Sequence, residues 1–159
     1  MKNFIVTTTI FNPSLAVKKF AKIKDWHLVI VGDLKTPHKK YLNIKNITYL
    51  TPDMQKKIAP KLSRLIGWNC IQRRNIGYIY AKKNGAKLIA SVDDDNIPYR
   101  NWGQKILINK RIETNSYQTN QSAFDPLSIF KFNSKIWHRG FPLQLLQEKP
   151  KLAKTKKKI

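Results

Sequence analysis

The fold is decided by residues 4–31, which read FIVTTTIFNPSLAVKKFAKIKDWHLVIV. Phe4–Ile10 is dense in β-branched side chains and is followed by Asn-Pro, which predicts a strand and then a turn. After a potential N-cap at Ser14, the apolar residues Ala16, Phe20 and Ile23 recur at i, i+4 and i+7, as in an amphipathic helix. Trp26–Val31 is a second apolar run. Together these segments predict a βαβ unit, whose strands are parallel by default.

Alternating strands and helices continue along the chain. Asn46–Leu50 predicts a third strand, and Met54–Leu65 a helix that Pro60 kinks or splits. A helix is expected over Asn75–Asn84, followed at once by a strand over Lys87–Val92. The interior of that last strand is small and apolar, which is typical of a central strand covered on both faces. We therefore expect an α/β fold.

The remaining residues carry weaker patterns. Pro98–Ser122 is polar and predicts a long loop, with strand character only at Lys105–Ile108. Leu127–Phe132 is expected to form a further strand. Lysines without an apolar face end the chain, which predicts a disordered basic tail. We expect one domain over residues 1–146 and this tail over 147–159.

The composition of the chain excludes some classes of protein, but it does not identify a binding partner. The 159 residues include 31 Lys plus Arg against 9 Asp plus Glu, a formal net charge of +22 that would suit a polyanion. Most of the cations are lysines, so the bias also fits an AT-rich genome. The single Cys70 excludes an internal disulfide and a cysteine metal cage. No apolar run approaches a membrane span, and we expect a cytoplasmic protein, at most peripheral to a membrane.

Polar residues follow three of the predicted strands. Thr7–Thr9 ends the first strand, Asp33 follows the second, and Asp93–Asp95 follows the strand over Lys87–Val92. Open α/β sheets bind ligands outside the carboxyl ends of their strands, so these residues are expected to line one crevice. Three consecutive aspartates in a chain with few acidic residues repel one another unless a cation or hydrogen bonds compensate.

The aspartates suit a divalent cation. Asp93 and Asp95 project to the same side of extended backbone, so their oxygens could hold Mg²⁺ or Mn²⁺ and leave positions for phosphate oxygens. The alternative is a solvated loop with Asx turns. Arg74 and Asn75 open a predicted helix, where an anion is favoured, although ordinary surface arginines also occupy such positions. Asp33 is either a ribose or base ligand or a plain turn residue.

Several short motifs of the sequence resemble the STELLO family of glycosyltransferases, and the resemblance covers about Phe4 to Leu143. Motifs that occur in the same order over most of a chain indicate a family more strongly than an isolated Asp-x-Asp. The motifs are Phe11-Asn12-Pro13, Trp26 through Asp33 with Thr36-Pro37, Arg74-Asn75-Ile76-Gly77-Tyr78 with Ala81, Gly85-Ala86-Lys87 leading to Asp93-Asp94-Asp95-Asn96, and Trp137 with Arg139-Gly140-Phe141-Pro142-Leu143.

The resemblance implies a Rossmann-like GT-A fold, a three-layer sandwich with a mainly parallel central sheet and helices on both faces. It implies a nucleoside-diphosphate sugar as ligand, most commonly a uridine diphosphate sugar, and a metal, Mn²⁺ or Mg²⁺, held at Asp93 and Asp95. Metal and arginine would stabilise the leaving diphosphate as the sugar–phosphate bond breaks. The residues expected to bind the nucleotide sugar are Thr7, Thr8, Asp33, Arg74, Asn75, Asp93 and Asp94.

The chain is shorter than most GT-A enzymes, and we expect much of the half that usually carries the acceptor site and the base to be absent. Asp125 and Glu113 are the candidate bases, without a motif behind either. The acceptor is unknown, and the sheet is expected to be incomplete, which would imply a homo-oligomer or a partner chain.

We favour a metal-dependent glycosyltransferase-like protein. The alternative is a non-catalytic relic that binds nucleic acid or acidic glycans through its basic face. Nucleic acid is the less favoured partner, because such a binder has no use for three aspartates in its crevice. A metal-dependent phosphohydrolase would need more carboxylate or histidine ligands than the chain supplies.

Overall fold

The computed structural model describes residues 2–148 and 151–158. Contacts divide the chain into unit 1, Met1–Gln104, and unit 2, Lys105–Ile159. Unit 1 holds β1 (Lys2–Thr9), α1 (Leu15–Phe20), β2 (Trp26–Gly32), α2 (His38–Leu42), β3 (Ile47–Leu50), α3 (Pro52–Ile58), α4 (Pro60–Ile66), the 3₁₀ turn η1 (Ile71–Arg73), α5 (Arg74–Lys83) and β4 (Ala86–Ser91).

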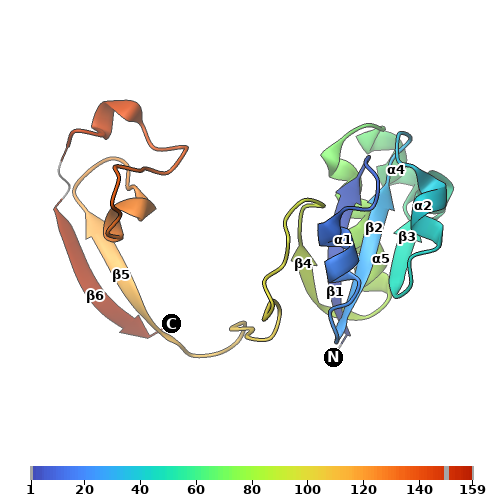
Figure 1. Ribbon diagram of the computed structural model, residues 1–159, viewed down its shortest axis with the longest axis horizontal. Helices are drawn as coiled ribbons and strands as arrows, with labels where there is room; N and C mark the ends of the chain where they lie inside the picture. Colours follow the sequence, from blue (N-terminus) through green and yellow to red (C-terminus); the bar gives the residue numbers. More distant parts are fainter. Residues whose placement is uncertain (1, 149–150, 159) are drawn as a thin grey trace. The chain divides into compact units, whose positions relative to one another are not determined.

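The sheet of unit 1 has four strands in the order β3-β2-β1-β4, and every neighbouring pair is parallel (Figure 1). The central pair is in register from Asn3 opposite Trp26 to Thr9 opposite Gly32. The predicted βαβ unit is therefore confirmed. The parallel sheet agrees with the predicted Rossmann-like architecture, because each crossover between parallel strands carries a helix across one face.

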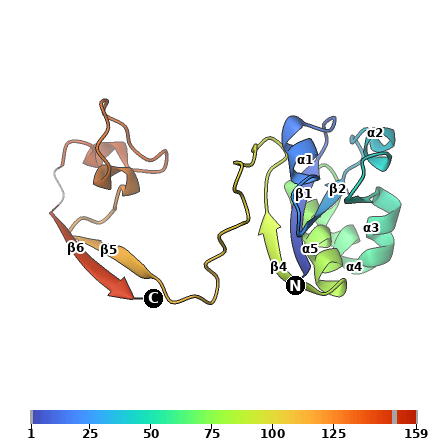
Figure 2. The same cartoon turned by 60° about the horizontal axis from the view of Figure 1, so that its bottom comes forward.

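Helices cover both faces of this sheet. Ile5 and Leu28 belong to a buried cluster with Phe20 of α1, whereas Val6 and Val31 belong to a second cluster on the side of α5. Neighbouring residues of one strand point to opposite faces, so both faces need apolar cover. Figure 2 shows α3, α4 and α5 on the side of the sheet away from α1. The predicted α/β fold with three layers is confirmed.

Local sequence signals explain where the helices begin and end. The side chain of Ser14 accepts a 3.1 Å hydrogen bond from the Val17 amide, as predicted for the N-cap of α1. Pro60 splits the predicted long helix into α3 and α4, with Ala59 between them in non-helical geometry. Proline has no backbone N–H to donate to the preceding turn, so the helix breaks where the sequence predicts it.

Gly77 lets α5 lie close to the sheet. A Cβ at this position would stand 2.5 Å from Val6 Cγ1 and 2.7 Å from Val31 Cγ2, which no real side chain tolerates without movement. The glycine of the Arg-Asn-x-Gly motif therefore serves packing, because it lets the helix approach the sheet. Its close approach fixes the height of α5 above β1 and β2, and with it the position of the first residue of the helix.

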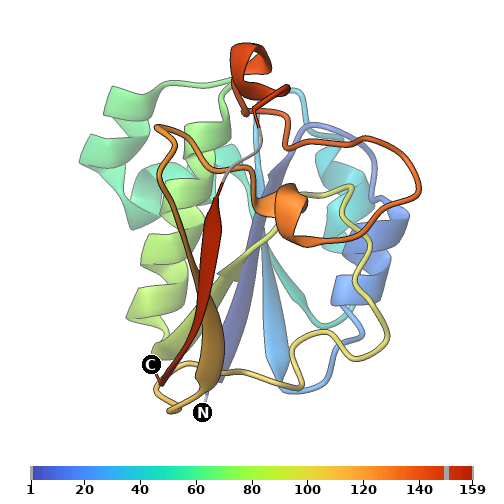
Figure 3. The same ribbon diagram turned by 90° about the vertical axis from the view of Figure 1, so that its left-hand side faces the viewer.

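Unit 2 is built around an antiparallel pair of strands, β5 (Glu113–Thr119) and β6 (Leu152–Lys158), which lie side by side in Figure 3. Two 3₁₀ turns, η2 (Pro126–Ile129) and η3 (Leu143–Leu145), complete it. The prediction of a strand over Leu127–Phe132 is wrong, because Pro126 begins a 3₁₀ turn there. Strand structure is also absent from the described residues 105–108, while β5 forms inside the segment expected to be loop.

The boundary at residue 146 between a domain and a tail stays a prediction. Residues 149, 150 and 159 of the expected tail, and residue 1 of the expected domain, lie outside the described residues. Among the helices that the structure describes, none combines the length and the apolar character that a membrane crossing requires.

Candidate functional site

The candidate site lies where the direction of strand addition reverses. From β1 the chain continues through α1 to β2 on one side, whereas β4 pairs with the other edge of β1. In open parallel sheets the crevice outside the carboxyl ends of two such strands is the usual ligand site. Here that crevice lies between the ends of β1 and β4, and the predicted polar residues follow both.

A cavity of about 390 Å³ occupies this position. It lies within unit 1 and is open enough to admit solvent and a ligand. Five of the residues predicted to bind the nucleotide sugar, together with the predicted metal ligand Asp95, line it. The lining residues are Thr8, Thr9, Ile10, Phe11, Asp33, Asn69, Cys70, Ile71, Arg74, Asp93, Asp94 and Asp95.

Arg74 and Asp93 form the charged wall of the cavity. Arg74 Nη2 donates to Asp93 Oδ1 at 2.6 Å, and Arg74 Nη1 donates to Ser91 Oγ at 3.2 Å. Tyr78 donates to the same Ser91 hydroxyl at 2.7 Å. The Arg74 side chain is only 14% exposed while that of Asp93 is 53% exposed. The pair therefore presents its carboxylate to the cavity and keeps the guanidinium fixed behind it.

Asp94 ties the segment after β4 to the first strand and helix. Thr9 Oγ1 donates to Asp94 Oδ2, and Ser14 Oγ donates to the Asp94 carbonyl oxygen. Thr9 Oγ1 also accepts from the Phe11 amide at 3.1 Å. Because its carboxylate is engaged with Thr9, Asp94 positions the loop that carries its two neighbours.

Asp33 is buried, at 1% exposure, and its carboxylate is occupied by backbone amides. Oδ1 accepts from the Leu34 amide at 2.6 Å and Oδ2 from the Cys70 amide at 3.3 Å. The amide of Asp33 in turn donates to Thr36 Oγ1 at 2.7 Å. The turn role considered for Asp33 is thus present in the structure, and the same residue also reaches the cavity wall.

The other predicted binding residues divide between the cavity and its surroundings. Thr8 lines the cavity, and its hydroxyl donates to the Val31 carbonyl oxygen at 2.8 Å. Thr7 is buried outside the cavity lining. Asn75 is exposed on α5 and is also absent from the lining. Of these three, only Thr8 is placed to touch a ligand in the crevice.

Asp95 is the least constrained carboxylate of the site. It is exposed, lines the cavity, and makes no hydrogen bond or ion pair with any residue that the structure describes. Asp93 and Asp95 together offer hard oxygen ligands beside open space, which suits Mg²⁺ or Mn²⁺. Within residues 2–148 and 151–158, no cluster of three or more His, Cys, Asp or Glu side chains is arranged to enclose a metal. A cation bound here would need oxygens from its ligand.

Arg73 supports the site from behind, and sequence reasoning did not distinguish it from Arg74. Arg73 is fully buried and donates to Gln55 Oε1 at 2.9 and 2.6 Å and to the Ser63 carbonyl oxygen at 2.9 Å. Its guanidinium lies 3.7 Å from the centre of the Trp68 ring. Burial lowers the pKa of Arg73 from its ordinary value. Arg73 joins α3 and α4 to the start of α5, and no local motif marks that role.

The two candidate bases lie in unit 2. Asp125 is almost fully buried, and its Oδ1 accepts from the Leu127 amide at 3.0 Å and from the His138 amide at 3.1 Å. Glu113 is paired with Lys156 at 2.9 Å on the exposed strand pair. Both carboxylates have partners of their own within unit 2, and their role as bases stays a prediction.

Comparison with known proteins tests the family resemblance of the chain. No family model matches the chain. Two curated proteins of Arabidopsis thaliana match it, "Probable glycosyltransferase STELLO2" and "Probable glycosyltransferase STELLO1", each 24% identical over 157 residues and 92% of the chain. The chain is similar to these two STELLO proteins over most of its own length. The resemblance predicted from the sequence motifs is confirmed, and the names of both relatives describe those proteins as probable glycosyltransferases.

The STELLO-like chain spans about a fifth of the length of these relatives, since each alignment covers 20% of the relative. Because each alignment covers 92% of the chain, it includes the Arg-Asn-x-Gly motif and the three aspartates. The similarity therefore extends over unit 1 and most of unit 2, and it leaves most of each relative without a counterpart here.

Proposed function

We propose that the chain binds a nucleoside-diphosphate sugar through a divalent cation and serves glycosyl transfer to an acceptor hydroxyl. The observation that carries the proposal is the meeting of Asp93, Asp95 and Arg74 around one cavity at the reversal of strand order. Carboxylates and a guanidinium at one crevice suit a ligand that brings both phosphates and a cation. The STELLO-like sequence supports the reaction class.

Asp93 and Asp95 are the residues that would hold Mn²⁺ or Mg²⁺. Both line the cavity, and both keep exposed carboxylate surface. When bound, the cation would act as a Lewis acid that neutralises charge on the departing diphosphate. With only two protein ligands, it would leave coordination positions for phosphate oxygens, as Mg²⁺ sites with phosphate substrates commonly do.

Arg74 has two functions in this proposal. Its bond to Asp93 orients one metal-binding carboxylate, and its positive charge at the start of α5 lowers the cost of bringing a diphosphate to the same wall. Ser91 holds the other side of the guanidinium, so the charge is fixed before a ligand arrives. Preorganised charge of this kind stabilises a leaving group without further reorganisation.

The remaining parts of the reaction need groups outside the crevice. The acceptor hydroxyl must lose a proton, for which Asp125 and Glu113 are the candidates in this chain, and a homo-oligomer or partner chain is the other source. A uridine diphosphate sugar is the donor we propose to test first, with guanosine diphosphate sugars as the comparison.

The first test is calorimetric titration of these sugars, with and without Mn²⁺, into the unaltered chain and the Asp93→Asn/Asp95→Asn variant. Asparagine keeps the shape of each side chain and removes its charge. The matched control is Asp25→Asn/Asp53→Asn, which removes two exposed carboxylates away from the cavity. Metal-dependent binding should survive in the control and disappear in the site variant.

Absence of donor binding in a folded, unaltered chain would overturn the proposal. The non-catalytic reading has its own signature, because binding to nucleic acid or acidic glycans falls steeply with salt. Such binding, unaffected by removal of Asp93 and Asp95 and without any donor binding, would instead support a shortened relic that acts as a binding module.

A further inference from the structure

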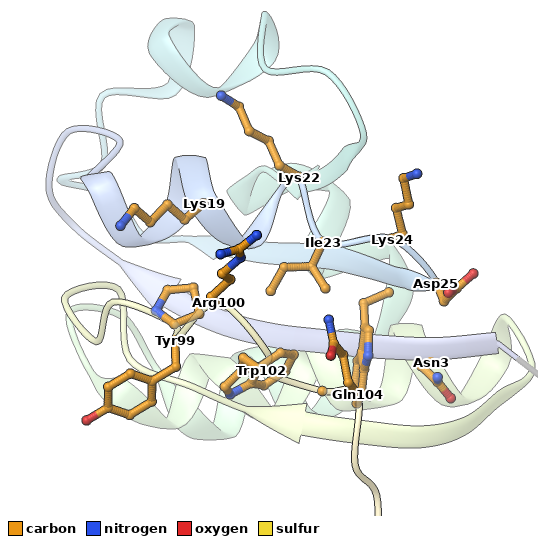
Figure 4. A pocket seen from close by; sticks show the side chains of 13 residues that line it. Asn3, Lys19, Lys22, Ile23, Lys24, Asp25, Tyr99, Arg100, Trp102 and Gln104 are labelled. Atoms are coloured by element: carbon orange, nitrogen blue, oxygen red, sulfur yellow. The ribbon is translucent and has the colours of Figure 1, made fainter.

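A second, larger cavity lies at the other end of the sheet in unit 1. It has a volume of about 900 Å³ and opens between the C-terminal end of α1 and residues 98–104 (Figure 4). We call it the basic pocket. Its lining residues are Asn3, Lys19, Lys22, Ile23, Lys24, Asp25, Trp26, Pro98, Tyr99, Arg100, Trp102, Gly103 and Gln104.

The charges around the basic pocket are unbalanced. Three lysines and one arginine line it, against a single carboxylate, Asp25. None of the four cations makes an ion pair within the part of the chain whose side chains are described. Figure 4 shows Lys19, Lys22 and Lys24 on the α1 side of the pocket, with Arg100 beside α1 and the Lys22 and Lys24 side chains extending away from Trp102. Four cations and a single carboxylate around one pocket favour a bound anion.

The floor of the basic pocket is aromatic and firmly packed. The rings of Trp26 and Trp102 are 5.0 Å apart with an angle of 57°, and Trp102 meets Phe20 edge to face at 5.1 Å. Gly103 lies against the indole of Trp26, where a Cβ would come within 2.7 Å of its Nε1 atom. These contacts hold residues 98–104 against α1, so the cavity is a formed feature of the unit.

The basic pocket is separate from the aspartate crevice. Asn3, at the beginning of β1, lines the pocket, whereas Thr8 and Thr9, at its end, line the crevice. A strand rises about 3.3 Å per residue, so the two ends of β1 are roughly 20 Å apart. A ligand in the basic pocket therefore does not contact the reacting atoms of a donor in the crevice unless it is a long molecule.

We infer that the basic pocket binds an anionic carbohydrate, a sugar chain that carries carboxylate or phosphate groups, and so anchors an extended acceptor away from the point of transfer. The cations supply attraction for the acidic groups. The exposed ring of Tyr99 offers apolar surface to the C–H face of a sugar ring. The choice of a carbohydrate rests on the proposed function, whereas the demand for an anion rests on the four unpaired cations alone.

Single-stranded nucleic acid fits the same pocket less well. Sequence-tolerant binding of single strands uses free aromatic faces on which successive bases stack. Trp26 and Trp102 are occupied by each other and by Phe20, and Tyr99, 84% exposed, is the ring that remains available. One free ring beside four cations favours charge recognition with apolar contact over a stacked strand.

The test uses the whole chain and follows the tryptophan indole N–H signals by NMR during titration. The probes are a short oligogalacturonide, which carries only carboxylates, a phosphate-bearing oligosaccharide, neutral maltohexaose, and a single-stranded oligothymidylate of matched charge. Both acidic sugars should shift the Trp26 and Trp102 signals, with affinity that falls as salt rises. Maltohexaose should leave them unchanged, and the two acidic probes distinguish carboxylate from phosphate as the preferred group.

The decisive variant is Lys22→Gln/Lys24→Gln/Arg100→Gln, and the matched control is Lys57→Gln/Lys61→Gln/Lys82→Gln. All six side chains are exposed, and the control lysines lie on α3, α4 and α5 across the sheet. Each exposed charge contributes only modestly to binding, so removal of three should make the pocket variant bind acidic sugars roughly ten- to a hundredfold more weakly. The control should bind as the unaltered chain does.

An equal loss in the control would overturn the inference, because it would show attraction to net charge without a site. Tighter binding of oligothymidylate than of either acidic sugar at the same indole signals would overturn the carbohydrate assignment. Donor titration of the pocket variant separates this inference from the proposed function, since donor binding in the crevice should persist when the pocket is disabled.

Discussion

Arg74 Nη2 donates to Asp93 Oδ1 at 2.6 Å, and this bond joins the first residue of α5 to the loop after β4. The two elements are consecutive in the chain, yet they run in opposite directions and leave the two residues 19 positions apart. The bond therefore closes one wall of the crevice. It also places a positive charge directly behind a carboxylate that we propose as a metal ligand.

Arg74→Lys should weaken donor binding about tenfold while changing the unfolding free energy by about 1 kcal/mol or less. Lysine keeps the charge, but a single ammonium does not reproduce the two-sided contact with Ser91 and Asp93. Calorimetric titration with Mn²⁺ and urea unfolding measure the two quantities. A large loss of stability with unchanged donor affinity would assign Arg74 to folding alone.

Asp94→Ala and Asp95→Ala should separate positioning from metal binding. Asp94→Ala removes the acceptor of the Thr9 hydroxyl, and we expect it to lower the unfolding free energy by about 1–2 kcal/mol. Asp95 is exposed without a described partner, so Asp95→Ala should change stability by less than about 0.5 kcal/mol. The Mn²⁺ dependence of donor binding should be lost in Asp95→Ala and retained in Asp94→Ala. The reverse pattern would exchange their roles.

Arg73→Met should destabilise the chain far more than Arg74→Met. The buried guanidinium makes five hydrogen bonds to Gln55, Ser63 and Gly67, and its removal leaves their buried oxygens without donors. We expect a loss of about 3 kcal/mol or more, measured as a lower urea midpoint. Similar midpoints for the two variants would show that solvent reaches the Arg73 site.

Gly77→Ala should destabilise unit 1 although alanine is the better helix former. The new Cβ would stand within 2.7 Å of both Val6 and Val31, and such overpacking costs about 1–3 kcal/mol. Lys82→Ala, at an exposed position of the same helix, is the control and should be neutral or slightly stabilising. In a double-mutant cycle, the losses caused by Gly77→Ala and Val31→Ala should be less than additive, because the second change removes one of the clashing methyl groups. Full stability of Gly77→Ala would mean that α5 can move off the sheet freely.

Stability at alkaline pH should depend on Tyr49. Burial raises the pKa of its hydroxyl from 10.0 to about 12, and the hydroxyl lies 2.6 Å from His38 Nδ1. The folded chain therefore holds this proton after the unfolded chain has lost it. The contribution is complete below about pH 10 and is lost as the pH rises toward about 12. Urea unfolding between these limits should show a shallower decline for Tyr49→Phe than for the unaltered chain.

Much of the fold could be predicted because its signals are local. The β-branched run of β1, the Ser14 cap and the break at Pro60 each depend on neighbours a few residues away. The strand β5 could not be predicted, because its residues are mostly polar, none is buried, and they show no apolar alternation. Its pairing with β6 depends on backbone partners about forty residues distant.

The sequence by itself determined the order of the four strands β1 to β4 along unit 1 and the presence of three aspartates after the last of them, because spacing along one segment is enough for both. That last strand, expected to be central, lies at the edge of the sheet. Only the tertiary structure decided what each side chain does. Arg73 and Arg74 are adjacent and identical in type, yet one is buried behind the crevice and the other faces it. Asp33 reaches the Cys70 amide across 37 residues. Burial and long-range partners set these roles, and neither is encoded in local spacing.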